Sequence, residues 1–182
     1  MNVMKYKIAV SGASKLNTCS KGIEKLAENL GREIAKSGSV LITGATTGVP
    51  YYSAKGCKEA GGISIGFSPA ASLKAHQKTY KLPIDQFDVI VFTGFDYSGR
   101  NLLMTRAADA VIICCGRMGT LNEFTIAFED KKPIGILEGS GGTADSIKDL
   151  LSKPHRKAAK IVYDRDPKRL VQKLLEVVKK GR

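Results

Sequence analysis

The sequence predicts an α/β protein with a Rossmann-like architecture, in which a doubly wound, mostly parallel sheet carries helices on both faces. Short apolar runs alternate with amphipathic segments along the 182 residues, the pattern of parallel βαβ units. The apolar run 110–115 is too short to span a membrane and is typical of a strand buried on both faces. A hydrophobic content of 43%, without repeats or low-complexity tracts, predicts a single domain over residues 1–182.

Each expected element follows from its local pattern. Apolar runs predict strands at 5–10, 40–42, 63–67, 89–92, 110–115, 134–137 and 161–163. Apolar residues at helical spacing predict helices at 23–35, 50–60, 99–107, 120–128, 143–152 and 170–178. Gly38 is expected to end the first helix, and Pro50 suits the first turn of the second. The segment 68–88 shows no period and is expected to be a long surface loop, either a flexible connector or a functional lid or oligomer contact.

The turn that follows the run 110–115 carries the clearest functional signal. Gly116 and Gly119 bracket a tight turn, Thr120 is a good residue to begin a helix, and Glu123 lies on the first turn of that helix. The first amide groups of a helix have no partner within it, so they attract anions, and glycines let a phosphate approach the backbone. Alternatively, the glycines only make a tight connection and Glu123 only stabilises the start of the helix.

The cysteines and histidines do not indicate a metal site. They are Cys19, Cys57, Cys114, Cys115, His76 and His155. No CxxC pair occurs and the histidines lie in separate segments, so zinc binding is not expected. Reduced thiols are the default, with Cys114 and Cys115 in the core of a strand. No signal peptide or membrane span is recognised, which predicts a cytoplasmic protein.

The net charge of +12 is concentrated near the C-terminus. From Lys153 onward, 11 Lys and Arg oppose 3 Asp and Glu, a balance of +8, which leaves +4 for the first 152 residues. Leu170, Leu174 and Val178 recur there at helical spacing, so the cations are most simply the solvated face of a terminal helix. Such a face favours anions in general. Nucleic-acid binding is possible but not favoured, because no aromatic-interleaved basic motif accompanies the charge.

The run from Gly99 to Glu123, followed by Lys132-Pro133, resembles the LOG (Lonely Guy) family, once mislabelled as lysine decarboxylases. The likeness spans most of residues 5–140 and is strongest to the small bacterial branch related to molybdenum-cofactor carrier proteins. The family signature is PGGxGTxxE with an upstream arginine. Residues that match it are Gly116, Gly119, Thr120, Glu123 and, upstream, Arg100.

The resemblance implies catalytic roles for Arg100 and Glu123 and a binding role for three glycine-rich loops. The expected phosphate-binding or nucleotide-binding residues are Gly12, Ser14, Gly44, Thr46, Thr47, Gly48, Gly116, Arg117, Met118, Gly119 and Thr120. LOG enzymes hydrolyse the N-glycosidic bond of nucleoside 5′-monophosphates to a free base and ribose 5-phosphate. They use no metal or organic cofactor, and the resemblance also implies a homodimer.

Three positions depart from the signature, with Cys115 for its proline, Arg117 for its second glycine and Asn101 for the lysine beside the arginine. Arg117 lacks the access of glycine to positive φ, and it either blocks the turn or adds a phosphate ligand; the basic surroundings favour the second. Asn101 fits the carrier branch better. The sequence therefore leaves two main hypotheses, a phosphoribohydrolase and a non-catalytic carrier of a nucleotide or of a phosphorylated pterin such as molybdenum cofactor.

Overall fold

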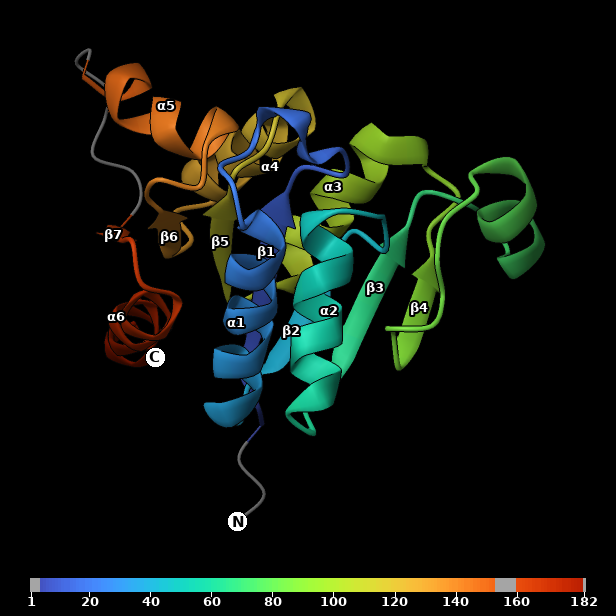
Figure 1. The fold of residues 1–182 in the computed structure, drawn as a ribbon, viewed down its shortest axis with the longest axis horizontal. Helices are drawn as coiled ribbons and strands as arrows, with labels where there is room; N and C mark the ends of the chain where they lie inside the picture. Colours follow the sequence, from blue (N-terminus) through green and yellow to red (C-terminus); the bar gives the residue numbers. More distant parts are fainter. Residues whose placement is uncertain (1–3, 153–159, 182) are drawn as a thin grey trace.

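The computed structural model describes residues 4–152 and 160–181, which form one seven-stranded sheet (Figure 1). Its strands are β1 (Lys7–Gly12), β2 (Val40–Thr43), β3 (Ser64–Ser68), β4 (Val89–Phe92), β5 (Ala110–Cys114), β6 (Ile134–Leu137) and β7 (Ile161–Asp164). Their order in the sheet is β4-β3-β2-β1-β5-β6-β7, and every pair of neighbouring strands is parallel. The predicted doubly wound fold is confirmed, with a sheet that is parallel throughout these residues rather than mostly parallel.

Helices cover both faces of the sheet. They are α1 (Ile23–Lys36), α2 (Val49–Glu59), α3 (Asp96–Ala107), α4 (Met118–Glu129), α5 (Gly142–Leu150) and α6 (Pro167–Lys180). The helices α1, α2 and α6 share one hydrophobic core with the sheet, and α3, α4 and α5 share a second core on the opposite face. Figure 1 shows α1 and α2 in front of the central strands and α3 and α4 behind them.

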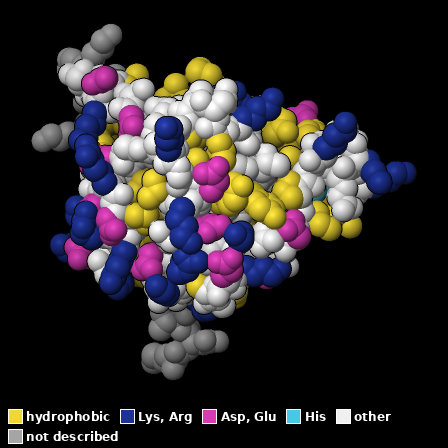
Figure 2. All heavy atoms as spheres, in the orientation of Figure 1, with side chains coloured by type: hydrophobic (Ala, Val, Ile, Leu, Met, Phe, Trp, Pro, Cys, Tyr) yellow, Lys and Arg dark blue, Asp and Glu magenta, His cyan; other side chains and the backbone are white. Residues whose placement is uncertain are grey.

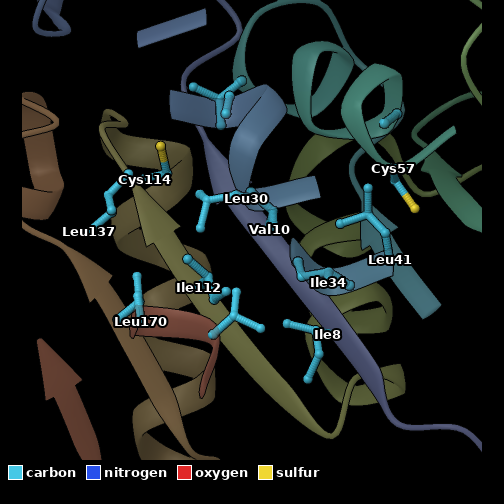
Figure 3. Packing of buried hydrophobic residues seen from close by; sticks show 14 of the residues in the cluster. Ile8, Val10, Leu30, Ile34, Leu41, Cys57, Ile112, Cys114, Leu137 and Leu170 are labelled. Carbon is cyan, nitrogen blue, oxygen red and sulfur yellow. The ribbon is translucent and has the colours of Figure 1, made fainter. Parts of the chain in front are cut away.

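The two cores follow from the alternation of side chains along the central strands. Ile8, Val10 and Ile112 point into the first core, whereas Ala9 and Val111 point into the second. Figure 3 shows the first core, where Leu30 and Ile34 of α1 and Leu170 of α6 meet these strands. Because β5 is buried on both faces, its sequence is apolar without interruption, which is why the run 110–115 could be recognised.

Most element boundaries agree with the sequence prediction to within two residues, whereas α3 and α6 each begin three residues earlier than predicted. The start of α4 differs by two residues, and this difference bears on the site. Thr120 was expected to begin this helix, but the helix begins at Met118, with Arg117 as its N-cap residue. Gly119 and Thr120 therefore lie inside the first helical turn, and their amide groups are among the unpaired donors of that turn.

The expectation of an irregular loop over 68–88 needs correction. The strand β3 extends to Ser68, and a π-helical turn, η2 (Ala75–Thr79), interrupts the segment. His76 anchors it, because this imidazole is fully buried, with Nδ1 2.8 Å from Ser68 Oγ and Nε2 2.9 Å from the Pro83 carbonyl oxygen. Hydrophobic periodicity could not predict this turn, because the segment is held in place by one buried histidine and not by an apolar stripe.

The charged surface over α1 and α2 carries both signs. Figure 2 shows Lys and Arg side chains interspersed with Asp and Glu on this face, and Lys55 bridges to Glu28 at 2.6 Å. The helix α6 buries its apolar side chains and exposes its lysines, as predicted. Of the cations expected near the C-terminus, those at 153–159, together with His155, lie outside the described residues. Within the described part of the chain, no helix has the length and apolarity needed to cross a bilayer.

The sheet reverses its strand order between β1 and β5. The chain proceeds outward from β1 to β4, crosses behind the sheet through α3, and returns to pair β5 with the other side of β1. Gly12 lies opposite Cys114, so the loops after these two strands leave the sheet at the same level. Open parallel sheets bind ligands at such a reversal, outside the carboxyl ends of the strands.

Candidate functional site

A cavity of about 350 Å³ lies at the carboxyl ends of β1 and β5, within the size range of small-molecule sites. The loops after β1, β2 and β5 and the first turns of α3 and α4 enclose it. The residues that line it are Gly12, Ala13, Ser14, Thr46, Tyr97, Arg100, Asn101, Arg117, Met118, Gly119, Thr120 and Glu123. Most of the residues expected to bind an anion or to perform chemistry are therefore brought together at one place.

The first turn of α4 forms one wall of the cavity. Leu121 donates to the Arg117 carbonyl oxygen, so the amides of Met118, Gly119 and Thr120 precede the first intrahelical hydrogen bond. No side chain of the described residues caps this helix. The positive end of a helix dipole and its free amides thus border the cavity, and this arrangement favours an anion.

In the turn before α4, the positive φ angles lie at residues 115 and 116, and not at 117, where the signature has its second glycine. Cys115 has φ +57° and Gly116 has φ +104°, while Arg117 has an extended φ of −138°. Arginine is therefore unstrained at position 117, and the loss of glycine there costs no backbone freedom. The φ of Cys115 is one that proline cannot adopt, so this turn needs the departure from the signature at position 115.

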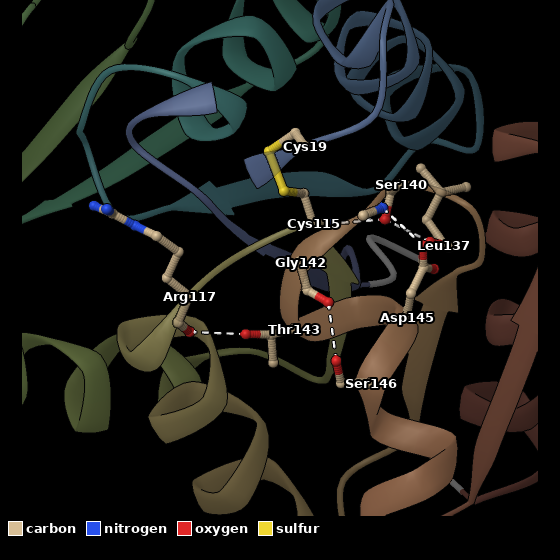
Figure 4. The surroundings of a disulfide bond; sticks show 10 residues. Cys19, Cys115, Arg117, Leu137, Ser140, Gly142, Thr143, Asp145 and Ser146 are labelled. Atoms are coloured by element: carbon tan, nitrogen blue, oxygen red, sulfur yellow. Dashed lines mark hydrogen bonds between the residues drawn. A yellow bond between two sulfur atoms is a disulfide. The ribbon is translucent and has the colours of Figure 1, made fainter. Parts of the chain in front are cut away.

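A disulfide joins Cys19 to Cys115, which corrects the expectation of reduced thiols. Cys115 lies beyond β5 rather than in its core, and its Cα is 5.5 Å from that of Cys19 (Figure 4). Backbone pairing brings the two segments together, because Ser20 donates to the Ser140 carbonyl oxygen and Ser140 Oγ accepts from Cys115 N at 2.8 Å. Cys114 is a buried free thiol in β5, as predicted.

Arg117 extends away from this disulfide. Its carbonyl oxygen accepts a hydrogen bond from Thr143 Oγ1 at 3.1 Å, which fixes the backbone of the turn. Figure 4 shows the guanidinium reaching out on the other side, away from Thr143. The side chain is exposed and lines the cavity, so it lies where it can contact a bound molecule.

Arg100 and Glu123 form a buried pair within the cavity lining. Arg100 Nη1 lies 3.9 Å from Glu123 Oε1, and each residue is about 6% exposed. Ser11 Oγ donates to Glu123 Oε2. Burial raises the pKa of the Glu123 carboxyl above its ordinary value, while the Arg100 charge and the Ser11 hydrogen bond oppose that rise without cancelling it. A carboxyl group of this kind is typical of functional sites.

The Arg100 guanidinium keeps hydrogen-bonding capacity for a ligand. Among the described residues, its one side-chain acceptor within hydrogen-bonding distance is the weak acceptor Met104 Sδ, 3.8 Å from Nη1. Burial lowers the pKa of Arg100 from its ordinary value, but the guanidinium stays charged at neutral pH. A buried cation with unused donors beside an anion-attracting helix terminus suits a phosphate or a polar oxygen.

Asn101 contacts the same carboxylate. Its amide is assigned with the nitrogen toward Glu123 Oε1 and the Tyr97 carbonyl oxygen, each at 2.8 Å, because both of these groups accept. The residue that replaces the lysine of the signature therefore supplies a neutral donor to Glu123, where a lysine would supply a charge.

Four of the expected binding residues do not line the cavity but contact residues that do. They are Gly44, Thr47, Gly48 and Gly116. A Cβ atom on Gly44 would lie 1.6 Å from Arg100 Nη1, so this glycine makes the space in which the guanidinium lies. Thr47 Oγ1 donates to the Ser14 carbonyl oxygen, and Gly48 packs against the backbone of the same loop. Gly116 holds the turn itself. These residues shape the site without bordering it.

Sequence reasoning missed Ser11 and Tyr97. Tyr97 precedes Arg100 by three residues and Asn101 by four, so helical spacing places all three on one face of α3, a signal that could have been used. Ser11 lies within β1, and only the pairing of β1 with β5 brings its hydroxyl to α4. No local pattern contains that information.

The chain is similar to known proteins over most of its length. The SLOG cluster4 family model matches residues 5–171. The crystal structure of TM1055 superposes with a TM-score of 0.82 and 28% identity, over 95% of this chain and 99% of that one. The molybdenum cofactor binding protein of Rippkaea orientalis gives a TM-score of 0.78 and 26% identity, over 97% and 99%. The molybdenum cofactor carrier protein of Chlamydomonas reinhardtii gives 0.72 and 27%, over 94% and 99%.

Proposed function

Because the chain belongs to the SLOG cluster4 family, a LOG-related family as its signature predicted, we propose that its cavity binds a small phosphorylated ligand and hydrolyses nucleoside 5′-monophosphates. The observation that carries this proposal is the buried Glu123 carboxyl, held between Arg100 and Ser11 beside the uncapped start of α4. A site for the anion and a group able to act on the adjoining sugar thus border one cavity.

The phosphate would bind at the first turn of α4. The amides of residues 118–120 supply donors, the Thr120 hydroxyl adds another, and Arg117 lines the same cavity from the turn. Gly119 supports this placement, because a Cβ atom there would meet no protein atom within 4 Å. The packing of the protein does not require a glycine at 119, whereas a phosphate lying on the backbone would.

Glu123 would act at the sugar. In the proposed step, its carboxylate orients a water molecule and accepts a proton as the water oxygen bonds to C1′ of the ribose. The N-glycosidic bond breaks, its electron pair goes to the base nitrogen, and a proton from solvent completes the free base. Positive charge that develops on the sugar is stabilised by the same carboxylate. Arg100 holds Glu123 in place and donates to the ligand.

A carrier role is the second candidate. Two of the similar structures are those of a molybdenum cofactor binding protein and a molybdenum cofactor carrier protein. On that hypothesis the same wall of amides holds the phosphate of a pterin, and Glu123 binds the ligand without transforming it. The neutral Asn101 beside Glu123 is compatible with either role.

We also propose that the chain forms a homodimer, as its family resemblance implies. Leu102 and Leu103 are each 40% exposed on α3, and other residues of the same helix line the cavity. An interface there would bury these side chains close to the site.

Replacement of Gly119 by alanine tests the phosphate site. Alanine favours a helix over glycine by about 1 kcal/mol, so the variant should be as stable as the native protein or slightly more stable. Its methyl group would project into the cavity, so affinity for ribose 5-phosphate should fall by about tenfold or more. Calorimetric titration and thermal melting measure the two quantities. Unchanged affinity would contradict a phosphate at this turn.

Replacement of Gly44 by alanine tests the position of Arg100. The new methyl group would displace the guanidinium, because Arg100 Nη1 lies only 1.6 Å from the site of the added carbon. The end of a flexible side chain can move, so the fold should persist, while base release should slow by roughly 10 to 100-fold. Gly181→Ala, at the end of α6, is the matched control and should leave the rate unchanged. A native rate in Gly44→Ala would exclude a positional role for Arg100.

A further inference from the structure

Tyr97 places an aromatic ring at the mouth of the cavity. It lies on the first turn of α3, lines the same cavity as Glu123, and is 49% exposed. Met118, on the first turn of α4, also lines the cavity and is 77% exposed. Two large side chains, one from each of two helices that pack together, thus border a site that contains the buried Arg100–Glu123 pair.

A second aromatic residue, Tyr80, holds the Tyr97 ring in position. Tyr80, from the segment after η2, packs edge to face against it with ring centroids 5.8 Å apart and an interplanar angle of 75°. The Tyr80 hydroxyl donates to Asp96 Oδ1, and Asp96 has a left-handed φ of +50° at the first position of α3. The Tyr97 ring is half exposed, and yet Tyr80 and the strained residue Asp96 hold it in one orientation. An ordinary surface tyrosine has no such support.

Arg100 lies on the inner side of this ring. Its Cζ is 5.9 Å from the Tyr97 ring centroid, and its Nη1 is 3.9 Å from Glu123 Oε1. A ligand anchored by its phosphate at α4 and by its sugar at Glu123 would therefore extend its third part toward Tyr97. An aromatic side chain binds a planar ring by stacking, whichever base the ring belongs to.

We infer that Tyr97 is a stacking platform for the planar heterocycle of the ligand, with Met118 closing the opposite side. This inference rests on the proposed function for the phosphate and sugar, and adds the residue that holds the remaining group, the flat nitrogen heterocycle of a nucleotide or pterin. Tyr80 is then a positioning residue for the platform. The segment 68–88, for which the sequence leaves a flexible connector, a lid and an oligomer contact open, then serves to orient a ring at the site.

Paired ligands test the platform. All proteins in this test carry Glu123→Gln, which prevents turnover, and GMP and ribose 5-phosphate are titrated against this parent and against its Tyr97→Ala and Tyr97→Phe derivatives. The base of GMP carries the 2-amino-4-oxo pyrimidine edge that pterins also carry. Tyr97→Ala should weaken GMP binding by about 10 to 100-fold and leave ribose 5-phosphate unchanged, and Tyr97→Phe should restore GMP binding.

The chain has no tryptophan, which provides a second readout. A Tyr97→Trp variant should have its fluorescence quenched by GMP but not by ribose 5-phosphate. Tyr163→Trp, on the edge strand β7, is the control and should respond to neither.

The outcomes separate the two levels of the proposal. If the parent protein binds ribose 5-phosphate and GMP equally well, or if Tyr97→Ala weakens both alike, the platform is wrong and the phosphate site stands. If the parent protein binds neither ligand, the proposed function is wrong and the platform is overturned with it.

Discussion

Replacement of Glu123 by glutamine is expected to slow the release of base from nucleoside 5′-monophosphates by about 10² to 10⁴-fold, the usual contribution of a general base. Glutamine keeps the size of the side chain and can still accept a hydrogen bond from Ser11. It cannot take a proton from water or stabilise a positively charged sugar. The measurement follows free base and ribose 5-phosphate over a panel of nucleoside 5′-monophosphates.

The control for this variant is Glu129→Gln, at the exposed end of the same helix, which should retain the native rate. Thermal melting belongs beside both assays, because removing the charge of Glu123 leaves the buried Arg100 without its anion. If Glu123→Gln stays folded and hydrolyses at the native rate, the proposed role of Glu123 is wrong. If neither the native protein nor Glu123→Gln releases base, while a nucleotide or pterin phosphate raises the Tm of both, the carrier role is supported.

The pH dependence of the reaction follows from the pKa of Glu123. The proposed base acts in its ionised form, and burial holds the pKa of this carboxyl above its ordinary value. The rate should therefore rise with pH, and it should reach half its maximum at a higher pH than an ordinary glutamate would give. A rate that instead falls as the carboxyl ionises would assign Glu123 the role of an acid.

Of the changes proposed here, reduction of the disulfide between Cys19 and Cys115 is expected to lower the free energy of unfolding most. The bond closes a loop across a sequence separation of 96 residues, and constraint of an unfolded chain over such a loop contributes about 4 to 5 kcal/mol. For a chain of this size, the Tm should fall on the order of 10 °C. Melting of the native protein with and without a phosphine reductant measures the change.

A Cys19→Ser/Cys115→Ser double variant provides the matching control. It should melt near the reduced native protein, and reductant should not lower its Tm further. Equal Tm values for oxidised and reduced native protein would show that the bond does not constrain the unfolded chain as expected. Because Cys115 directly precedes Gly116, the same samples also show by titration with ribose 5-phosphate how far the bond supports the anion turn.

The fold could be predicted because its signals are local. An uninterrupted apolar strand, a glycine turn and an apolar stripe on the next helix each lie within about a dozen residues, and they recur along the chain. The pairing of Arg100 with Glu123 in one site was anticipated from a signature, and the structure places the two side chains 3.9 Å apart.

The features that were not predicted depend on contacts between distant segments. The partner of Cys115 is 96 residues away, and no spacing rule connects the two. Gly44 lies outside the cavity lining and makes room for Arg100, a relation that exists only once β2 and α3 are assembled. The π-helical turn around His76 depends on one buried imidazole, which has no periodic signature.

Because β1 lies between β2 and β5 in the sheet, one of its edges has no partner strand until β5 has been synthesised. The first half of the chain can build β1 to β4 as a continuous half-sheet, because these strands are adjacent in order. Until β5 is synthesised, β1 is the open edge of that half-sheet, with Ile8 and Val10 lacking the neighbours they later have. A bare apolar edge invites pairing with another nascent chain. The insertion of β5 therefore both completes the wall of the cavity and removes this risk of aggregation.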